Sequence, residues 1–403
     1  MMDTLAERAS SKVAGDTTTS DIVGTYKRAP MRFVSGSGVE LFDDTGKAYL
    51  DLSSGIAVNA LGYGDAGIRR VMNDVLESGL IHASNLYRTE AGERLAHFLV
   101  ENSFASSVFF CNSGAEANEG AFKFARRWGR ATGSDGKTGI VALRGGFHGR
   151  LFASLAATDR PSYRAPFRPL AGGVSICERD ATELDAALDG ESVAAVIVEP
   201  VQGEGGVRVV EPDLLRYLRR ITSERGIALI FDEIQCGLGR LGTFMAYERF
   251  GVVPDMVTIA KPLGGGLPMG AVLVTGEIAA TIKPGDHGTT FGGGPMVASV
   301  ADYVVRRLSE PGLLASVREN GEWFGERLSG MARRSSRVRA VRGMGYMWGL
   351  DVVDPASDIV QRGWDAGLLV ITAGEHTLRF LPPLVMERKD LERGLDILES
   401  VIG

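Results

Sequence analysis

The chain has 403 residues, of which 44% are hydrophobic and 23% charged, and its formal net charge is −6. This length predicts at least two packed units, and the acidic balance argues against a general nucleic-acid-binding protein. The three cysteines, Cys111, Cys177 and Cys236, lie far apart without a C-x-x-C pair, so we expect neither a disulfide framework nor a bound metal.

The N-terminal residues up to about 25 are predicted to form a mobile or helical lead-in. They are polar and contain no apolar core of signal-peptide length. No later segment reaches the roughly 18 consecutive apolar residues of a membrane span, so we expect a cytoplasmic protein with no membrane partner. The next stretch, VELFDDTGKAYLDL (39–52), alternates around an Asp-Thr-Gly turn and predicts a β-hairpin.

The central part of the chain alternates helical patterns with short buried runs. These runs are SSVFFCNSG (106–114), TGIVALRGG (138–146), VAAVIVEP (193–200), IALIFDEI (227–234), DMVTIAK (255–261) and MGAVLVTG (269–276). Continuous apolar runs of this kind, separated by helices, indicate an α/β fold with a mostly parallel central sheet that helices cover on both faces.

The pattern changes after about residue 310. A predicted helix (312–334) is followed by the strand-like VRAVRGMGYMWGLDV (338–352), a helix, the strand-like TLRFLP (377–382) and a final helix. This order predicts a smaller α+β unit at the C-terminus.

Polar residues follow most of the central strands. In an open parallel sheet the ligand lies beyond the carboxyl ends of the strands, so we expect one site built from several strand ends. The turn Asn112-Ser113-Gly114 precedes a helix whose first N–H groups could hold a phosphate. A plain helix start, with Ser113 as N-cap and Glu116 completing a capping box, remains the alternative for this motif taken alone.

Two further strand ends carry residues with the chemistry of one cofactor. Lys261 ends a buried run, where loss of hydration lowers the pKa of an ammonium and makes it a nucleophile, although a lysine reaching to the surface is the alternative. Asp232 ends another. A lysine, an acid for the pyridinium nitrogen and a phosphate site are the requirements of pyridoxal 5'-phosphate. Phe147 and His148 add aromatic candidates to stack on its ring.

The chain is similar to the class III (subgroup II) pyridoxal-phosphate-dependent aminotransferases, and among these it most resembles the acetylornithine aminotransferases. The resemblance covers nearly the whole chain and rests on the combination and order of the motifs CNSGAEANE, GGFHGR, VIVEPVQGEGG, IFDEIQCGLGR, PDMVTIAKPLGGGLPMGA and TTFGGGP. It implies fold type I, with residues 1–60 contributing to the small domain, 61–310 forming the large cofactor-binding domain and 311–403 forming the C-terminal small domain.

The resemblance also implies roles for the residues around the cofactor ring. Lys261 would bind the cofactor covalently and carry the proton, and Asp232 would pair with the pyridinium nitrogen. Gln235 would hydrogen-bond the ring hydroxyl, and Phe147, next to His148, would stack on the ring.

The cofactor phosphate would be held by Ser113, Gly114 and Ala115. Thr290 of the TTFGG motif would join them from a second subunit. The resemblance therefore implies a homodimer with its active sites at the interface.

Two arginines are expected to recognise the substrates. Arg150 would bind the α-carboxylate of the amino donor, and Arg379 the α-carboxylate of 2-oxoglutarate. Glu204 would pair with Arg379 while the donor is bound. The alternatives for the arginines taken singly are a charge at a helix start for Arg150 and a surface ion pair for Arg379.

The expected reaction transfers the terminal amino group of N-acetylornithine to 2-oxoglutarate, giving N-acetylglutamate 5-semialdehyde and glutamate for arginine biosynthesis. Gly55 and Ile56 occupy positions at which the ornithine aminotransferases carry an aromatic residue. By this resemblance, the small and aliphatic residues here favour an acylated ornithine as the substrate. The chain departs from the family pattern at three places. Tyr63, in LGYGDAG, is expected near the entrance of the active site. Leu241 replaces a common Thr, and Gly294 replaces a common Asn.

Other functions remain open at this stage. The near alternative is a related ω-aminotransferase acting on succinylornithine, carrier-linked lysine, 4-aminobutyrate or ornithine. The spacing of Gly237, Gly239 and Gly242 matches G-x-G-x-x-G and would suit a nucleotide-dependent oxidoreductase. We interpret these glycines instead as letting a loop pass close to the cofactor and the neighbouring subunit. A non-catalytic cofactor-binding regulator is disfavoured because Lys261 is present.

Overall fold

A computed structural model describes residues 21–403 of the chain. The predicted lead-in falls mostly outside these residues, and the part that is described, 21–25, contains bends and no helix. The predicted hairpin is confirmed as β2 (Glu40–Asp43) and β3 (Ala48–Asp51), which pair antiparallel. Across the described residues, no helix combines the length and the apolar character that crossing a membrane requires.

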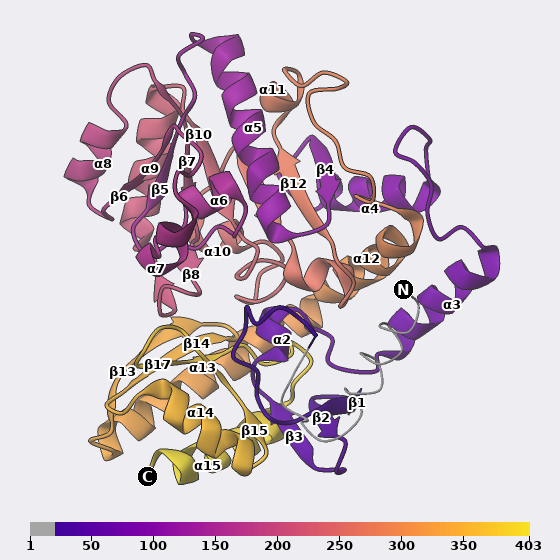
Figure 1. Cartoon of the computed structure of the whole chain (residues 1–403), viewed down its shortest axis with the longest axis vertical. Helices are drawn as coiled ribbons and strands as arrows, with labels where there is room; N and C mark the ends of the chain where they lie inside the picture. Colours follow the sequence, from indigo (N-terminus) through magenta and orange to yellow (C-terminus); the bar gives the residue numbers. More distant parts are fainter. Residues whose placement is uncertain (1–20) are drawn as a thin grey trace, which may run out of the picture.

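A seven-stranded sheet forms the centre of the upper part of the molecule (Figure 1), with the strand order β4-β12-β11-β10-β7-β5-β6. Its strands are β4 (Ser107–Cys111), β5 (Gly139–Leu143), β6 (Val174–Cys177), β7 (Val193–Val198), β10 (Ala228–Asp232), β11 (Met256–Ile259) and β12 (Gly270–Val274). Only β12 runs antiparallel to its neighbours, so the predicted, mostly parallel sheet is confirmed. Sequence reasoning missed the edge strand β6, in which only Cys177 of the four residues is buried.

Alternate residues of the central strands pack into two separate cores, as expected for strands covered on both faces. In β7, Ala195 and Ile197 face the core beneath α5 (Gly114–Thr132), whereas Val196 and Val198 belong to the core that includes α9 (Pro212–Glu224). The other helices of this part are α3 (Ala66–Ser78), α4 (Glu90–Glu101), α6 (Phe152–Ala156), α7 (Pro161–Arg164), α8 (Ala181–Ala187), α10 (Ala246–Phe250), α11 (Gly276–Ala279) and α12 (Pro295–Leu308).

The C-terminal part forms a second layer below the large sheet (Figure 1). Its elements are α13 (Pro311–Arg334), β13 (Val338–Met344), β14 (Met347–Val352), α14 (Ala356–Asp365), β15 (Leu368–Leu369), β16 (Ile371–Thr372), β17 (Thr377–Phe380) and α15 (Arg388–Ile402). The predicted order of helices and strands is therefore present. β15 pairs with β3, in the sheet β1-β2-β3-β15 that begins with β1 (Phe33–Ser37), so the N-terminal segment packs with this part. The domain boundaries at residues 60 and 310 stay a prediction.

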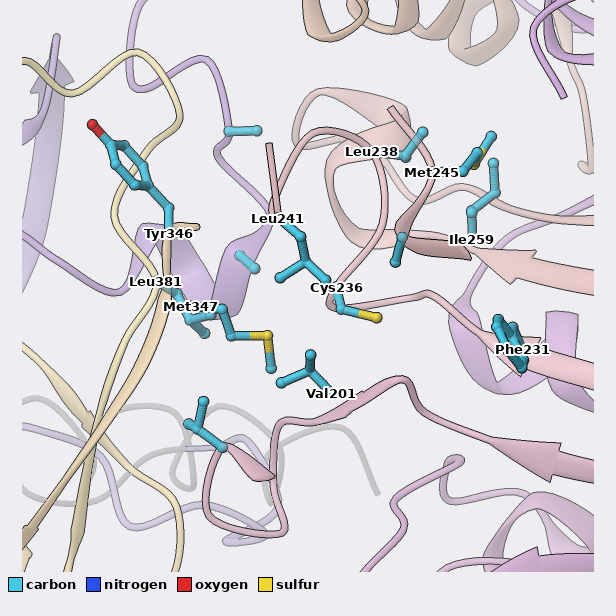
Figure 2. Close-up of a cluster of buried hydrophobic side chains, with 14 of the residues drawn as sticks. Val201, Phe231, Cys236, Leu238, Leu241, Met245, Ile259, Tyr346, Met347 and Leu381 are labelled. Atoms are coloured by element: carbon cyan, nitrogen blue, oxygen red, sulfur yellow. The ribbon is translucent and has the colours of Figure 1, made fainter. Parts of the chain in front are cut away.

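The glycine-rich segment 237–242 connects the two parts of the molecule. An added Cβ at Gly239 would lie 2.9 Å from Cδ1 of Leu384, and one at Gly242 would overlap Arg318, so these glycines permit close contact with the C-terminal part. Figure 2 shows Leu241 of this segment near Met347 and Tyr346, while Phe231 and Ile259 come from the large sheet. Within the described chain the segment lies against the C-terminal part and does not line the cavity around Lys261.

Arg240, within this segment, is buried and fastens it to the C-terminal part. Its Nη1 donates hydrogen bonds to the backbone oxygens of Tyr346, at 3.0 Å, and Pro382, at 2.5 Å. Burial lowers the pKa of the guanidinium to about 9. No helix follows Gly237 directly, since the next one is α10, so the glycines do not form the strand-to-helix turn that a dinucleotide-binding site requires.

Replacing Gly345 by alanine is expected to destabilise the protein by about 1–3 kcal/mol. Its added Cβ would lie 2.5 Å from the backbone oxygen of Arg240 and 2.7 Å from Cα of Leu241. Gly251→Ala is the matched control, because Gly251 has a similar φ of +64° but open space around it. Both variants strain the backbone, but only Gly345→Ala brings its new methyl group too close to Arg240 and Leu241. We therefore expect a lower melting temperature for Gly345→Ala, and equal melting temperatures of the two variants would contradict this.

Candidate active site

The carboxyl ends of five strands meet around one cavity of about 400 Å³. Most of the predicted site residues line it: Ser113, Gly114, Ala115, Phe147, His148, Arg150, Glu204, Asp232, Gln235 and Lys261. Arg379 reaches the same place from β17 through hydrogen bonds to two of these residues. Thr290 is exposed and does not line the cavity within this chain.

One end of the cavity is the N-terminus of α5. Ser113 is the N-cap, and its Oγ accepts a hydrogen bond from the backbone N–H of Glu116 at 3.2 Å, so the predicted capping role is confirmed. In the predicted capping box, the carboxylate of Glu116 would accept from the N–H of Ser113. In the structure it accepts from the N–H of Asn112 instead. The N–H groups of Gly114 and Ala115 have no acceptor within the helix and the Ser113 hydroxyl keeps its own proton, so this end can bind a phosphate.

Asp232 lies at the buried floor of the cavity. Its Oδ2 accepts hydrogen bonds from Nδ1 of His148 and Nδ2 of Asn118, both at 2.8 Å, and its Oδ1 accepts one from the N–H of Ile234. Oδ1 of Asn118 in turn accepts from the Thr258 hydroxyl at 2.8 Å. These bonds fix the orientation of the carboxylate, which faces the cavity as a hydrogen-bond acceptor for a pyridinium N–H.

Lys261 lies two residues after the end of β11 and faces the same cavity. Burial lowers the pKa of its ammonium, although the negative charge of Asp232 acts in the opposite direction. A lowered pKa leaves more of the amine unprotonated and able to act as a nucleophile or a base. The backbone of Lys261 has a φ of +38°, a strained conformation for a residue with a side chain, and such strain concentrates at functional sites.

Glu204 and Arg379 form an ion pair beside the cavity. Nη2 of Arg379 donates to Oε1 of Glu204 at 2.7 Å, and Nη1 donates to Oε1 of Gln235 at 3.2 Å. Arg379 is only 2% exposed, and its Nε has no hydrogen-bond partner among the described residues. Because the oxygen of Gln235 accepts from Arg379, its NH₂ group remains as a donor for the cavity.

The structure adds Glu199, which sequence reasoning missed although it directly follows β7. Its two carboxylate oxygens accept from the N–H groups of Phe147, at 2.7 Å, and Gly203, at 3.1 Å. Burial raises the pKa of this carboxyl to about 7. Glu199 thus joins the segment that carries Phe147 to the one that carries Glu204. Its position as the first carboxylate after a buried strand was the available signal.

The three departures from the family pattern lie outside the cavity. The hydroxyl of Tyr63 donates to the buried Asp51, so within this chain it fastens the segment after β3 and does not line the cavity. Its expected place near the entrance stays a prediction. Leu241 is part of the core between the two parts of the molecule, and Gly294 is the N-cap residue of α12.

The cavity fits pyridoxal phosphate. It combines free N–H groups at a helix start, a buried carboxylate fixed by His148 and Asn118, an aromatic side chain at Phe147 and a lysine of lowered pKa. The lysine, the acid and the phosphate site are the three requirements of this cofactor, and Phe147 supplies a side chain that can cover its ring.

A family model described as class-III aminotransferase matches residues 24–402. The chain belongs to the class-III aminotransferases. It is 45% identical to a mitochondrial acetylornithine aminotransferase of Alnus glutinosa, over 94% of this chain and 84% of that protein. The match confirms the class that the motifs indicated, and it makes this chain a pyridoxal-phosphate-dependent transaminase.

Solved structures of other class-III aminotransferases confirm fold type I. The N-acetylornithine aminotransferase of Stenotrophomonas maltophilia superimposes with a TM-score of 0.82 at 33% identity, covering 94% of this transaminase and 96% of that chain. The ornithine aminotransferase of Toxoplasma gondii gives 0.90 at 25% identity, covering 100% and 95%. A nucleotide-dependent oxidoreductase is excluded by this membership, and the spacing of the three glycines is a coincidence.

Proposed function

We infer that this transaminase moves the terminal amino group of N-acetylornithine to 2-oxoglutarate, giving N-acetylglutamate 5-semialdehyde and glutamate. The observation that carries this function is the pair of arginines around Lys261. One of them is free to bind a carboxylate, and the other is paired with a carboxylate of the protein. Arg150 lines the cavity with an exposed side chain, whereas Arg379 is held by Glu204. The names of the relatives from Alnus glutinosa and Stenotrophomonas maltophilia support this choice of donor.

The two arginines match the different shapes of the two substrates. N-acetylornithine carries its carboxylate at the end remote from the reacting amine, so Arg150 binds that end while Glu204 neutralises Arg379. In 2-oxoglutarate a carboxylate is attached directly to the reacting carbon. Arg379 binds it after Glu204 has moved away, because a planar guanidinium holds a carboxylate through two parallel hydrogen bonds.

Several residues would hold the cofactor and assist its chemistry. When bound, pyridoxal phosphate withdraws electrons from the substrate carbon next to the amino group and so makes the proton on that carbon removable. The Lys261 amine accepts this proton and returns it to the neighbouring position, which its lowered pKa permits. Asp232 keeps the proton on the ring nitrogen, Phe147 stacks on the ring, and Gln235 donates to the ring oxygen.

The phosphate would bind at Ser113, Gly114 and Ala115, together with the partner subunit's Thr290. We propose a homodimer for this reason. Thr290 lies on an exposed surface whose neighbour Phe291 is 64% exposed and contacts the ring of His82, and Leu86 and Tyr87 nearby are 88% and 72% exposed. Exposed apolar side chains gathered in this way favour a protein interface. We further propose a cytoplasmic location.

Another ω-aminotransferase activity remains the second candidate, because the Toxoplasma gondii structure with a TM-score of 0.90 is an ornithine aminotransferase. The discriminating feature is the segment at Gly55 and Ile56. Ile56 is 44% exposed and lines a second cavity, which Arg379 and Glu204 also line. These side chains leave room beside the ion pair that an aromatic residue would fill.

A panel of amino donors tests the proposed function. The full chain, loaded with pyridoxal phosphate, is assayed with 2-oxoglutarate and N-acetylornithine, N-succinylornithine, ornithine, lysine or 4-aminobutyrate. We expect the highest kcat/KM for N-acetylornithine. A higher value for ornithine or 4-aminobutyrate would overturn the proposed donor, and no glutamate from any donor would overturn the activity.

A further inference from the structure

The guanidinium of Arg150 lies against aromatic rings and, among the described residues, pairs with no acid. Its central carbon lies 3.6 Å from the centre of the Tyr163 ring and 5.7 Å from that of Phe147. Within residues 21–403 no carboxylate or carbonyl oxygen forms a hydrogen bond with this guanidinium. Arg379, by contrast, has Glu204 as its partner, so the two arginines of the cavity are held in chemically different ways.

Stacking holds an arginine without occupying its hydrogen-bond donors. A ring contacts the flat face of the guanidinium, whereas a carboxylate binds in its plane, through the N–H groups at its edge. An acid partner would have to be displaced before a substrate could bind. The Tyr163 ring can therefore fix the orientation of Arg150 while its N–H groups stay free for a substrate carboxylate.

Tyr163 is fixed relative to the segment that carries Arg150. It lies in α7, just after Thr158, whose Oγ1 accepts from the backbone N–H groups of His148 at 2.9 Å and Gly149 at 3.2 Å. Asp159 accepts from the N–H of Gly145 at 2.9 Å. The chain segments that carry Tyr163 and Arg150 are therefore joined by these hydrogen bonds.

We propose that Tyr163 is a positioning residue that sets the preference for amino donors with a carboxylate remote from the reacting amine. The proposal rests on the proposed function, in which Arg150 binds that carboxylate. An arginine side chain has many conformations, and restricting them before the donor arrives lowers the conformational entropy lost on binding. The effect therefore appears in the binding of the donor and not in the chemical step.

Three variants test this role. Tyr163→Leu removes the ring, Tyr163→Phe keeps it, and Tyr217→Leu removes a ring that lies 5.3 Å from Arg220, away from the cavity. We expect Tyr163→Leu to raise the KM for N-acetylornithine about 3- to 30-fold with little change in kcat. Tyr163→Phe restores most of the wild-type KM. Turnover of N-acetylputrescine, which lacks the carboxylate, stays unchanged.

A binding measurement separates this proposal from the proposed function. N-acetylnorvaline has the carboxylate and chain of N-acetylornithine but no terminal amine, so its Kd is measured by calorimetry without turnover. We expect Tyr163→Leu to raise this Kd about as much as the KM. An unchanged Kd, or no binding to the wild-type enzyme, would overturn the role of Tyr163. If N-acetylornithine is bound but not turned over, the proposed function fails and the Kd comparison still decides on Tyr163.

Discussion

Replacing Lys261 by alanine is expected to abolish the covalent attachment of pyridoxal phosphate and to lower the rate of transamination by at least ~10³-fold. Lys261 is the one lysine among the residues that line the cavity around Asp232. The proton on the substrate carbon would then have no base of lowered pKa to accept it. Borohydride reduction followed by mass spectrometry measures the attachment directly, since the added mass should appear on the peptide that contains Lys261.

Two further measurements make this result specific. Lys261→Arg keeps the positive charge, but a guanidinium does not lose its proton at working pH, so we expect it to be as inactive as the alanine variant. Methylamine added to Lys261→Ala supplies a small external base and should recover part of the rate. A retained mass increase on the Lys261→Ala protein, or normal turnover, would show that another residue performs both tasks.

The chain's apolar runs were sufficient to predict six of the seven strands of the large sheet. The runs that end at Cys111, Val198 and Asp232 are strands as expected, because residues buried on both faces leave a continuous apolar signal. β6 gave no such signal, since it is short and lies at the edge of the sheet. The pairing of β3 with β15 joins residues more than 300 positions apart, and no local pattern encodes it.

Site residues could be predicted from the sequence when a reactive side chain lies at the end of an apolar run. Lys261 and Asp232 are examples, and the cavity brings both together. Asn118 and Tyr163 were not predicted, because each acts on a neighbour across the fold and looks alone like an ordinary helix residue. Glu199 was missed although it directly follows a buried strand. The expected closeness of the glycine segment to the cofactor was wrong for a similar reason: Gly239 and Gly242 contact the C-terminal part of the same chain, away from the cavity around Lys261. Its expected contact with a neighbouring subunit stays a prediction.

Replacing Arg379 by lysine is expected to lower kcat/KM for 2-oxoglutarate about 10- to 100-fold while leaving the donor half-reaction close to wild type. An ammonium keeps the charge but offers no planar pair of N–H groups to the α-carboxylate, and one charge-assisted hydrogen bond contributes about 1.5–3 kcal/mol. In the proposed reaction the donor does not use Arg379, because Glu204 keeps the ion pair that this structure shows at 2.7 Å. Single-turnover measurements of the two half-reactions separate these effects.

Arg306→Lys is the matched control, because Arg306 pairs with Asp302 on α12 through two nitrogens and does not line the cavity. It should leave both half-reactions unchanged. Glu204→Gln provides the opposite test: without the negative charge Arg379 is uncovered in both steps, so glutamate should compete more strongly with N-acetylornithine as the donor. Equal losses in the two half-reactions of Arg379→Lys would mean that Arg379 supports the whole cavity, and its assignment to the keto acid would then be wrong.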